Sequence, residues 1–293
     1  MQVLALSMRN SFVGVSRRRI LSKCSPAKTR QPIKLHLRSI ITAKVHLAWS
    51  SAGVATLHKH YNDGPVNLLA SYAIWDQFLT SKPGINISNL QVDSGAFSVF
   101  RSGKVIDIDK FIVVAKQNPQ AEIFSLDEIG NWQKSQANTL KIWAAGVPAM
   151  PIYHAGEPRN YLDWCVENTP CGKIAIACTS KDRAGVVREQ FKYIWDKYGG
   201  IKIHGLAMAS PKMLAVGPFD SVDASSWATA PGRFGQFCGF TGKQLHLKSK
   251  MRKGVDSDLW CEVREHQKRE KFSEFVFRHE LERIRYPGYT IRK

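Results

Sequence analysis

Acidic residues are scarce in this chain, and the first of them is Asp63. Asp and Glu total 24 against 42 Lys and Arg, which gives the 293 residues a formal net charge of +18. A protein this basic attracts polyanions, because each phosphate that it neutralises releases a condensed counterion. The charge therefore favours a nucleic acid as partner, with a solubilising charge or an unspecific basic tail as the alternative.

Long apolar runs, paired cysteines and glycine-rich phosphate loops are also missing. No apolar run approaches the roughly 20 residues of a membrane span, so we expect no membrane association. None of the six cysteines forms a CxxC pair or a common zinc spacing, which predicts reduced thiols in a cytosolic protein and no metal site. The absence of a GxGxxG loop disfavours an open, dinucleotide-binding sheet.

The segment before Lys44 is rich in Arg, Lys and Ser and has no sustained hydrophobic period. This composition predicts a mobile, basic arm over residues 1–43. An Arg- and Ser-rich start without acids also fits an organelle transit peptide, and a translation start placed too far upstream is a third interpretation. In all three interpretations the fold begins near Val45.

From Val45 onward, short apolar segments alternate with longer, more polar segments of helical character. The predicted strands are Val45–Trp49, Asn89–Asp93, Ala121–Leu126, Val147–Tyr153, Lys173–Cys178, Ile201–Leu206, Phe219–Val222 and Phe234–Phe240. The predicted helices are Pro65–Thr80, Asp107–Lys116, Trp132–Ala145, Glu157–Glu167, Asp182–Tyr198 and Pro211–Val216. Eight strands with helical crossovers predict an α/β fold, a (β/α)8 TIM-type barrel over residues 44–241. Residues 242–293 are expected to form a basic, mostly helical C-terminal extension.

Local signals support several of these helix ends. Asp107 and Asp182 are suitable N-caps, and Pro65 and Pro211 suit a first helical turn. Gly199 and the glycine after it are expected to stop the helix that ends at Tyr198.

Carboxylates follow several predicted strands. Asp93, Asp127 and Asp223 stand at three strand ends, and His154 follows a fourth. Because barrel active sites lie at the C-terminal ends of the strands, we expect these side chains around one mouth. Helix capping explains each aspartate singly. Together they suit either a site for a hard cation or glycosidic-bond chemistry, with one carboxylate as nucleophile and another handling the proton.

These segments resemble signatures of the tRNA-guanine transglycosylases, in the same order along the chain, between about Val45 and Phe240. The matching segments are Val92–Phe97 (the family's Asp-Ser-Gly-Gly-Phe-Gln), Ser125–Glu128, Pro151–Gly156, Ile203–Ala207 (its Gly-Gly-Leu-Ala turn) and Asp220–Trp227. The resemblance implies base exchange through a covalent aspartyl-glycosyl intermediate, by an enzyme of the pentosyltransferase class that needs no cofactor.

The resemblance also implies roles for the carboxylates. Asp223 matches the nucleophile that attacks C1′, and Asp93 matches the acid/base group near the incoming base. Asp127 matches the residue that pairs with the guanine edge. Asp220 is the alternative nucleophile, because Phe219-Asp220-Ser221 is similar to the bacterial form of the motif.

A second set of residues is expected to bind the base. Ser94 and Gly95 belong to the first signature, and His154 stands where the family has glutamine. The backbone of the turn is expected to contact the 7-substituent of a deazaguanine through Gly205, Leu206 and Ala207. Tyr153, Phe97 and Trp227 are candidates to stack on an extruded base, with a place in the hydrophobic core as the alternative for each.

The chain departs from the family at three points. Ala96 and Ser98 replace residues of the first signature, and the Cys-x-Cys-x-x-Cys and His zinc site is missing, since Cys238 and His246 do not rebuild it. A zinc-free relative is similar to the phage and bacterial branch that inserts 7-deazaguanines into DNA.

The expected partners are accordingly DNA and a free 7-deazaguanine base such as 7-cyano-7-deazaguanine, in the cytoplasm of a bacterial or phage-infected cell. A homodimer stays open. The alternatives are the same exchange on tRNA, hydrolysis that releases the base, and a barrel that binds nucleic acid without turnover.

Overall fold

The computed structural model describes residues 43–97, 105–227, 236–240, 245–250, 267 and 270. The chain divides into two compact units, Met1–Leu35 and His36–Lys293, and all described residues belong to the second. The expected arm over residues 1–43 therefore lies outside the described residues, apart from Ala43. Within the described part of the chain, no helix is long and apolar enough to cross a membrane.

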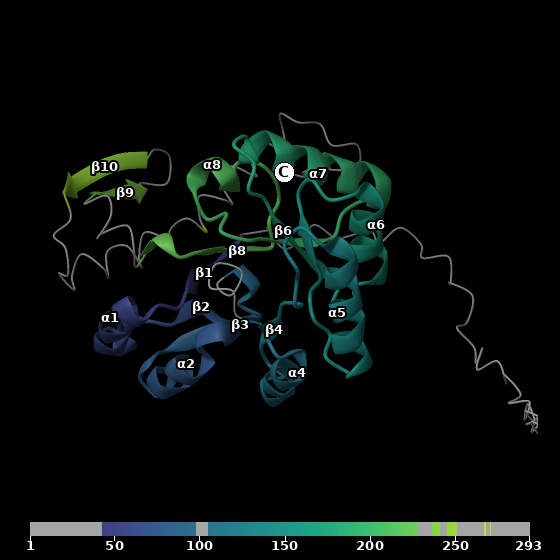
Figure 1. Cartoon of the computed structure of the whole chain (residues 1–293). Helices are drawn as coiled ribbons and strands as arrows, with labels where there is room; N and C mark the ends of the chain where they lie inside the picture. Colours follow the sequence, from purple (N-terminus) through teal and green to yellow (C-terminus); the bar gives the residue numbers. More distant parts are fainter. Residues whose placement is uncertain are drawn as a thin grey trace, which may run out of the picture. The chain divides into compact units, whose positions relative to one another are not determined.

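Eight parallel strands form one sheet in the order β4-β3-β2-β1-β8-β7-β6-β5 (Figure 1). They are β1 Lys44–Ala48, β2 Val66–Ser71, β3 Ile87–Asp93, β4 Glu122–Ile123, β5 Ile152–His154, β6 Lys173–Ala177, β7 Lys202–Gly205 and β8 Ser221–Ala224. The two edge strands meet at a parallel bridge between Phe124 and Met150. The Ser125 N–H donates to the Met150 carbonyl at 2.8 Å, and the Met150 N–H donates to the Ile123 carbonyl at 2.8 Å. The sheet thus closes on itself, which confirms the predicted α/β barrel.

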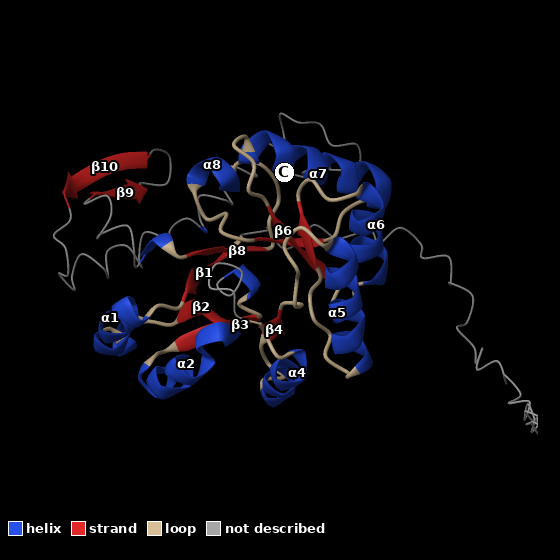
Figure 2. Ribbon diagram, in the orientation of Figure 1, coloured by secondary structure: helices blue, strands red, loops and turns tan. Residues whose placement is uncertain are grey.

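Helices connect the strands and lie outside them (Figure 2). They are α1 Val54–Lys59, α2 Trp75–Ser81, α4 Ile108–Gln117, α5 Trp132–Ala144, α6 Arg159–Asn168, α7 Arg183–Tyr198 and α8 Pro211–Leu214, with short 3-10 turns at Ser51–Gly53, Tyr61–Asp63, Tyr72–Ile74 and Lys82–Gly84. The predicted caps are confirmed: Asp107 accepts from two N–H groups of α4, and Asp182 accepts from the Gly185 N–H of α7. Gly199 ends α7 in the left-handed conformation.

Two sequence predictions of secondary structure were wrong. The helix expected over Pro65–Thr80 is strand β2 followed by α2, because a strand of a parallel barrel is buried on both faces and its apolar run lacks alternation. The strand expected at Phe234–Phe240 is β9 Gln236–Phe240, which pairs antiparallel with β10 Leu245–Lys250 in a separate sheet. Since β10 belongs to the extension, the extension is not helical throughout. Beyond β10, the residues of the expected extension lie outside the described part of the chain, except for Gln267 and Glu270.

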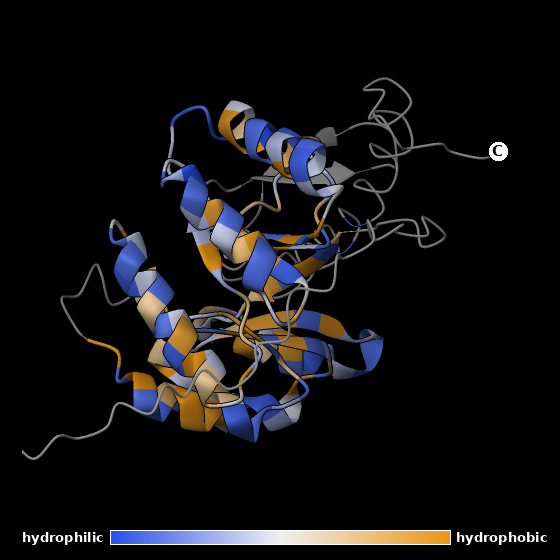
Figure 3. Ribbon diagram, turned by 90° about the vertical axis from the view of Figure 1, so that its right-hand side faces the viewer, coloured by the Kyte–Doolittle hydropathy of each residue, from blue (hydrophilic) through white to orange (hydrophobic). Residues whose placement is uncertain are grey.

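Apolar side chains fill both sides of the barrel wall. Figure 3 shows hydrophobic and hydrophilic residues side by side along the helices, as expected when one helix face packs on the strands. One cluster lies among β1–β4 and their helices, and a second among β5–β8 and theirs. A third cluster faces the barrel interior and consists of Leu69, Phe124, Met150, Ile152 and Ala175.

Polar side chains occupy the rest of the described barrel interior. Gln91, His204 and Ser221 are fully buried, and His46 is 1% exposed. Buried polar groups of this kind are costly unless they are hydrogen-bonded, so their partners decide what they do.

Candidate active site at the C-terminal end of the barrel

Asp93 ends β3 and lies near two other carboxylates. Its Oδ2 accepts a hydrogen bond from the Gly95 N–H at 3.0 Å. Burial, together with the negative charges of Asp127 and Asp223, raises the pKa of Asp93 to about 7, although backbone hydrogen bonds oppose the change. The structure therefore brings together the three aspartates that the sequence placed at strand ends.

Asp223 has two contacts that reach the same carboxylate oxygen. Its Oδ1 accepts from the Ala207 backbone N–H at 2.7 Å and contacts His204 Nε2 at 3.2 Å. Ala207 is in the left-handed region, with a φ of +54°. Asp223 is 7% exposed, so both hydrogen bonds are shielded from water.

Asp127 follows β4 and pairs with His154, the last residue of β5. His154 Nε2 lies 2.8 Å from Asp127 Oδ2. Burial favours the neutral imidazole, but the hydrogen bond and charge of Asp127 outweigh it and raise the pKa of His154. The two residues expected at the base are thus in direct contact.

Glu157 is a fourth carboxylate at this end, which the sequence reasoning missed as a site residue. Its Oε2 accepts from the His154 backbone N–H at 2.8 Å, and its Oε1 is buried without a hydrogen-bond partner. Burial raises the pKa of Glu157, and Asp127 adds to this effect. The signal was present in the sequence, because Glu157 follows His154 in the same short turn.

His204 was also missed, although it lies inside the segment Ile203–Ala207. Polar Lys202 and His204 alternate with apolar Ile203, which is the pattern of a strand with one polar face. His204 is fully buried and contacts Asp223, Ser221 and Gln91. The alternation was readable in the sequence.

Asp220 does not lie with this group. It precedes β8, and its Oδ2 is 2.7 Å from Nζ of Lys173, the first residue of β6. Lys173 also binds Glu122, the first residue of β4. All three residues lie at the N-terminal ends of their strands, opposite the end that holds Asp223.

The glycines of the site are required by packing. Gly95 has a φ of +82°, and a Cβ there would lie 2.7 Å from Ala73 Cβ and from Ser71 Oγ. A Cβ on Gly205 would lie 2.6 Å from Phe219 Cε1. Ser94 is fully buried, and its Oγ accepts from the Ala96 N–H at 3.3 Å. In the described contacts, these three residues therefore hold the backbone in place.

The backbone groups of the turn after β7 form hydrogen bonds within the protein. The Leu206 N–H donates to the Ile176 carbonyl, and the Ala207 N–H donates to Asp223. Arg183 donates to the Leu206 and Ala207 carbonyls at 3.3 and 3.2 Å. These hydrogen bonds fix the turn, and the amide hydrogens of Leu206 and Ala207 are already used.

The candidate stacking aromatics differ in exposure. Trp227 is fully buried, with its Nε1 donating to the Ala48 carbonyl, and Tyr153 is 1% exposed, with its hydroxyl donating to the Glu157 carbonyl. Phe97, which follows the Asp93 turn, is 62% exposed. Tyr153 and Trp227 therefore belong to the core, and Phe97 is the aromatic of the three with a free face.

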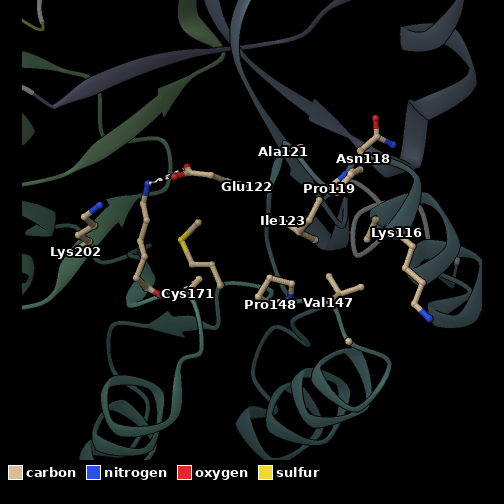
Figure 4. A pocket seen from close by; sticks show the side chains of 14 residues that line it. Lys116, Asn118, Pro119, Ala121, Glu122, Ile123, Val147, Pro148, Cys171 and Lys202 are labelled. Atoms are coloured by element: carbon tan, nitrogen blue, oxygen red, sulfur yellow. Dashed lines mark hydrogen bonds and ion pairs between the residues drawn. The ribbon is translucent and has the colours of Figure 1, made fainter. Parts of the chain in front are cut away.

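Two cavities open at the other end of the barrel. One has about 470 Å³ and is lined by residues that include Glu122, Lys173 and Lys202; in Figure 4, Lys116 and Lys202 lie on opposite sides of it. The other has about 280 Å³ and includes His46 and Glu122. The charge of Lys173 and hydrogen bonds from Gln91 and Lys173 lower the pKa of Glu122 to about 2 against the effect of burial, so this end holds a satisfied ion pair. Asp93 and Glu157, by contrast, have raised pKa values and lie at the C-terminal end of the barrel.

No group of three or more potential metal ligands occurs among the described residues. No protein-family model and no curated protein matches the chain.

The chain is similar in fold to solved structures of tryptophan synthase alpha-subunit variants from the hyperthermophile Pyrococcus furiosus. One is 9% identical, with 76% of this chain and 97% of that chain covered and a TM-score of 0.46. Another is 11% identical, with the same coverage and a TM-score of 0.45. The barrel assignment rests on the strand pairing of this chain.

Proposed function

We propose that this chain exchanges guanine in DNA for a 7-deazaguanine base through a covalent intermediate on Asp223. The observation that carries the proposal is a pair of carboxyl groups in different surroundings at one end of the barrel. Asp223 Oδ1 accepts the Ala207 N–H and contacts His204 Nε2, which orients the carboxylate as a nucleophile. The pKa of Asp93 is raised by burial to about 7, which suits a group that gives and takes a proton near neutral pH.

The exchange takes place in two balanced steps. A carboxylate oxygen of Asp223 attacks C1′, the bond from C1′ to N9 breaks, and Asp93 gives its proton to the departing guanine. The incoming base then attacks C1′ through N9, Asp93 takes the N9 proton, and Asp223 leaves as a carboxylate. The proton count on Asp93 is the same before and after, so the exchange needs no further reactant.

Base recognition is assigned to the neighbouring groups. The Asp127–His154 pair offers carboxylate and imidazole atoms of a kind that bonds to the edge of a purine. Phe97, with most of its surface exposed, offers an aromatic face for stacking. DNA is preferred over tRNA because the family's zinc segment is missing, and the net charge of +18 suits either polyanion.

The test supplies labelled 7-cyano-7-deazaguanine and, separately, labelled guanine to the purified full chain with duplex DNA and with bulk tRNA. Label is expected in DNA. Asp223→Asn is expected to lower the rate by about 10³-fold or more, and Asp93→Asn by about 10²-fold or more. Asp63→Asn is the matched control, since that carboxylate is exposed and pairs with His60.

The outcomes separate the alternatives. Label in tRNA alone would keep the chemistry and overturn the DNA assignment. Loss of base from DNA without incorporation would indicate hydrolysis. Binding of DNA without any label, unchanged in an Asp93 and Asp223 double variant, would support a non-catalytic barrel.

A further inference from the structure

The two oxygens of Asp223 differ in their surroundings. Oδ1 accepts the Ala207 N–H at 2.7 Å and lies 3.2 Å from His204 Nε2. Both contacts involve Oδ1, whereas Oδ2 forms no hydrogen bond with any of the described residues. A carboxylate anchored through one oxygen cannot rotate freely and keeps the lone pairs of the other oxygen available.

His204 can serve as a donor to Asp223 only if its Nε2 carries the proton. A chain of contacts through the barrel interior supports that tautomer. Gln91 Nε2 lies 2.7 Å from Glu122 Oε2, and because a carboxylate only accepts hydrogen bonds, this contact fixes which end of the Gln91 amide is the nitrogen. Glu122 is in turn held by Lys173 at 2.9 Å.

The same amide nitrogen lies 3.3 Å from His204 Nδ1 and 3.4 Å from Ser221 Oγ, and its hydrogen not used by Glu122 is available to both. Nδ1 is therefore an acceptor, and the Ser221 hydroxyl, 2.8 Å away, can donate to it as well. The proton of the neutral ring is then on Nε2, where it meets Asp223 Oδ1. The contact with Asp223 also requires a proton on Nε2, because a lone pair there would repel a carboxylate oxygen at 3.2 Å.

The charge state of the ring agrees with this arrangement. Burial lowers the pKa of His204, and the Asp223 hydrogen bond and charge oppose the change only in part. An imidazolium would also place an N–H on Nδ1 against the Gln91 amide hydrogen. His46, the other buried histidine of the interior, lies with its ring centroid 6.3 Å away and also has its pKa lowered by burial, to about 3.

We propose that neutral His204 is a positioning residue that, with the Ala207 N–H, anchors Asp223 through Oδ1 and leaves Oδ2 as the oxygen that attacks C1′. This inference rests on the proposed function for its reaction step. In that step the bond from Oδ2 to C1′ forms, the bond from C1′ to N9 breaks with its electron pair on the base, and Asp93 supplies the proton. His204 keeps its own proton throughout.

Two variants separate positioning from packing. His204→Gln keeps an N–H donor at a similar reach, whereas His204→Leu removes it. We expect kcat of the leucine variant to fall by about 10²-fold with KM nearly unchanged, and the glutamine variant to recover most of that loss. His46→Leu is the control for an apolar substitution in the same interior, because His46 makes no hydrogen bond to Asp223 within the described residues. Equal losses in His204→Leu and His46→Leu, or no recovery by glutamine, would overturn the proposal.

A second measurement is independent of turnover and is made on the wild-type chain. Nitrogen-15 NMR of the full wild-type chain, labelled at its nine histidines, reports the tautomer of each ring. The His204 resonances are assigned as those that are lost in His204→Gln. A neutral ring protonated at Nε2 at pH 7 is the expected result. A ring protonated at Nδ1, or an imidazolium, would refute the positioning role even if bases are exchanged, whereas the expected tautomer without exchange would refute the proposed function alone.

Discussion

His154 Nε2 lies 2.8 Å from Asp127 Oδ2, and this contact joins two residues that are 27 positions apart in the sequence. The pKa of His154 is raised because the hydrogen bond and charge of Asp127 outweigh the effect of burial. A charged His154 therefore holds the Asp127 carboxylate in one orientation at the proposed base site.

His154→Gln is expected to weaken binding of the incoming base by about 10-fold, because it replaces the imidazolium that pairs with Asp127 by a neutral amide donor. The imidazolium is present below its raised pKa and is lost as pH rises through it. The ratio of variant to wild-type KM for the base should therefore be larger at pH 6 than at pH 9. Steady-state kinetics at the two pH values measure this, and a ratio independent of pH would contradict the assigned charge state.

Asp93→Asn is expected to stabilise the fold at pH 8. The folded state holds a proton on Asp93 up to about pH 7, whereas the unfolded chain releases it near pH 4. Between these values the unfolded state binds fewer protons, so the free energy of unfolding falls as pH rises, and above about pH 7 the penalty is complete. Removing the charge should recover about 1–3 kcal/mol at pH 8 and little at pH 4. Urea unfolding at both pH values tests the prediction. An equal change in the free energy of unfolding at both pH values would show that the charge of Asp93 does not destabilise the fold.

Asp220→Asn should affect stability and spare the chemistry. The substitution leaves Lys173 with Glu122 as its remaining carboxylate, so we expect a loss of about 1–3 kcal/mol in the free energy of unfolding. The exchange rate should stay within about 3-fold of wild type at a temperature where the variant is folded. If this variant folds and loses activity as Asp223→Asn does, the nucleophile is wrongly assigned.

Gly95→Ala should cost more stability than Gly130→Ala. Both glycines have positive φ, +82° and +84°, but a Cβ on Gly95 would meet Ala73 and Ser71 while one on Gly130 would meet open space. Strain at φ costs about 1 kcal/mol in either variant, and the clash at Gly95 adds about 1–3 kcal/mol. Thermal unfolding of the matched pair measures the difference, and equal midpoints would show that the Asp93 turn can move.

The barrel could be predicted from sequence because hydrophobic segments and helix caps recur along most of its length. The caps at Asp107 and Asp182 and the stop at Gly199 depend on local chemistry, and each is where the residues predicted it. Strand β2 could not be distinguished in this way, since Val66–Ser71 is buried on both faces and runs into α2 through a 3-10 turn. The final predicted strand was displaced because β9 pairs with β10, a contact that local pattern does not encode.

The site residues that stand at strand ends could be predicted from the sequence. Those whose role depends on contacts in the barrel interior could not. Asp93, Asp127 and His154 follow from the rule that barrel sites gather at one end. Asp220 and Asp223 are three residues apart, and only the strand register separates the end that faces Lys173 from the end that faces His204. The roles of Gln91 and Glu122 needed coordinates, because their contacts cross the barrel.

Peptide mapping of the trapped intermediate tests the central claim most directly. The full chain would be mixed with a guanine-containing duplex in the absence of a competing base, quenched, digested and analysed by mass spectrometry for a sugar-linked peptide. We expect the adduct on Asp223, in the peptide that contains Ser221 to Trp227, and none in Asp223→Asn. An adduct on Asp93 or Asp220, or exchange of base that proceeds with no adduct at any time point, would contradict the account.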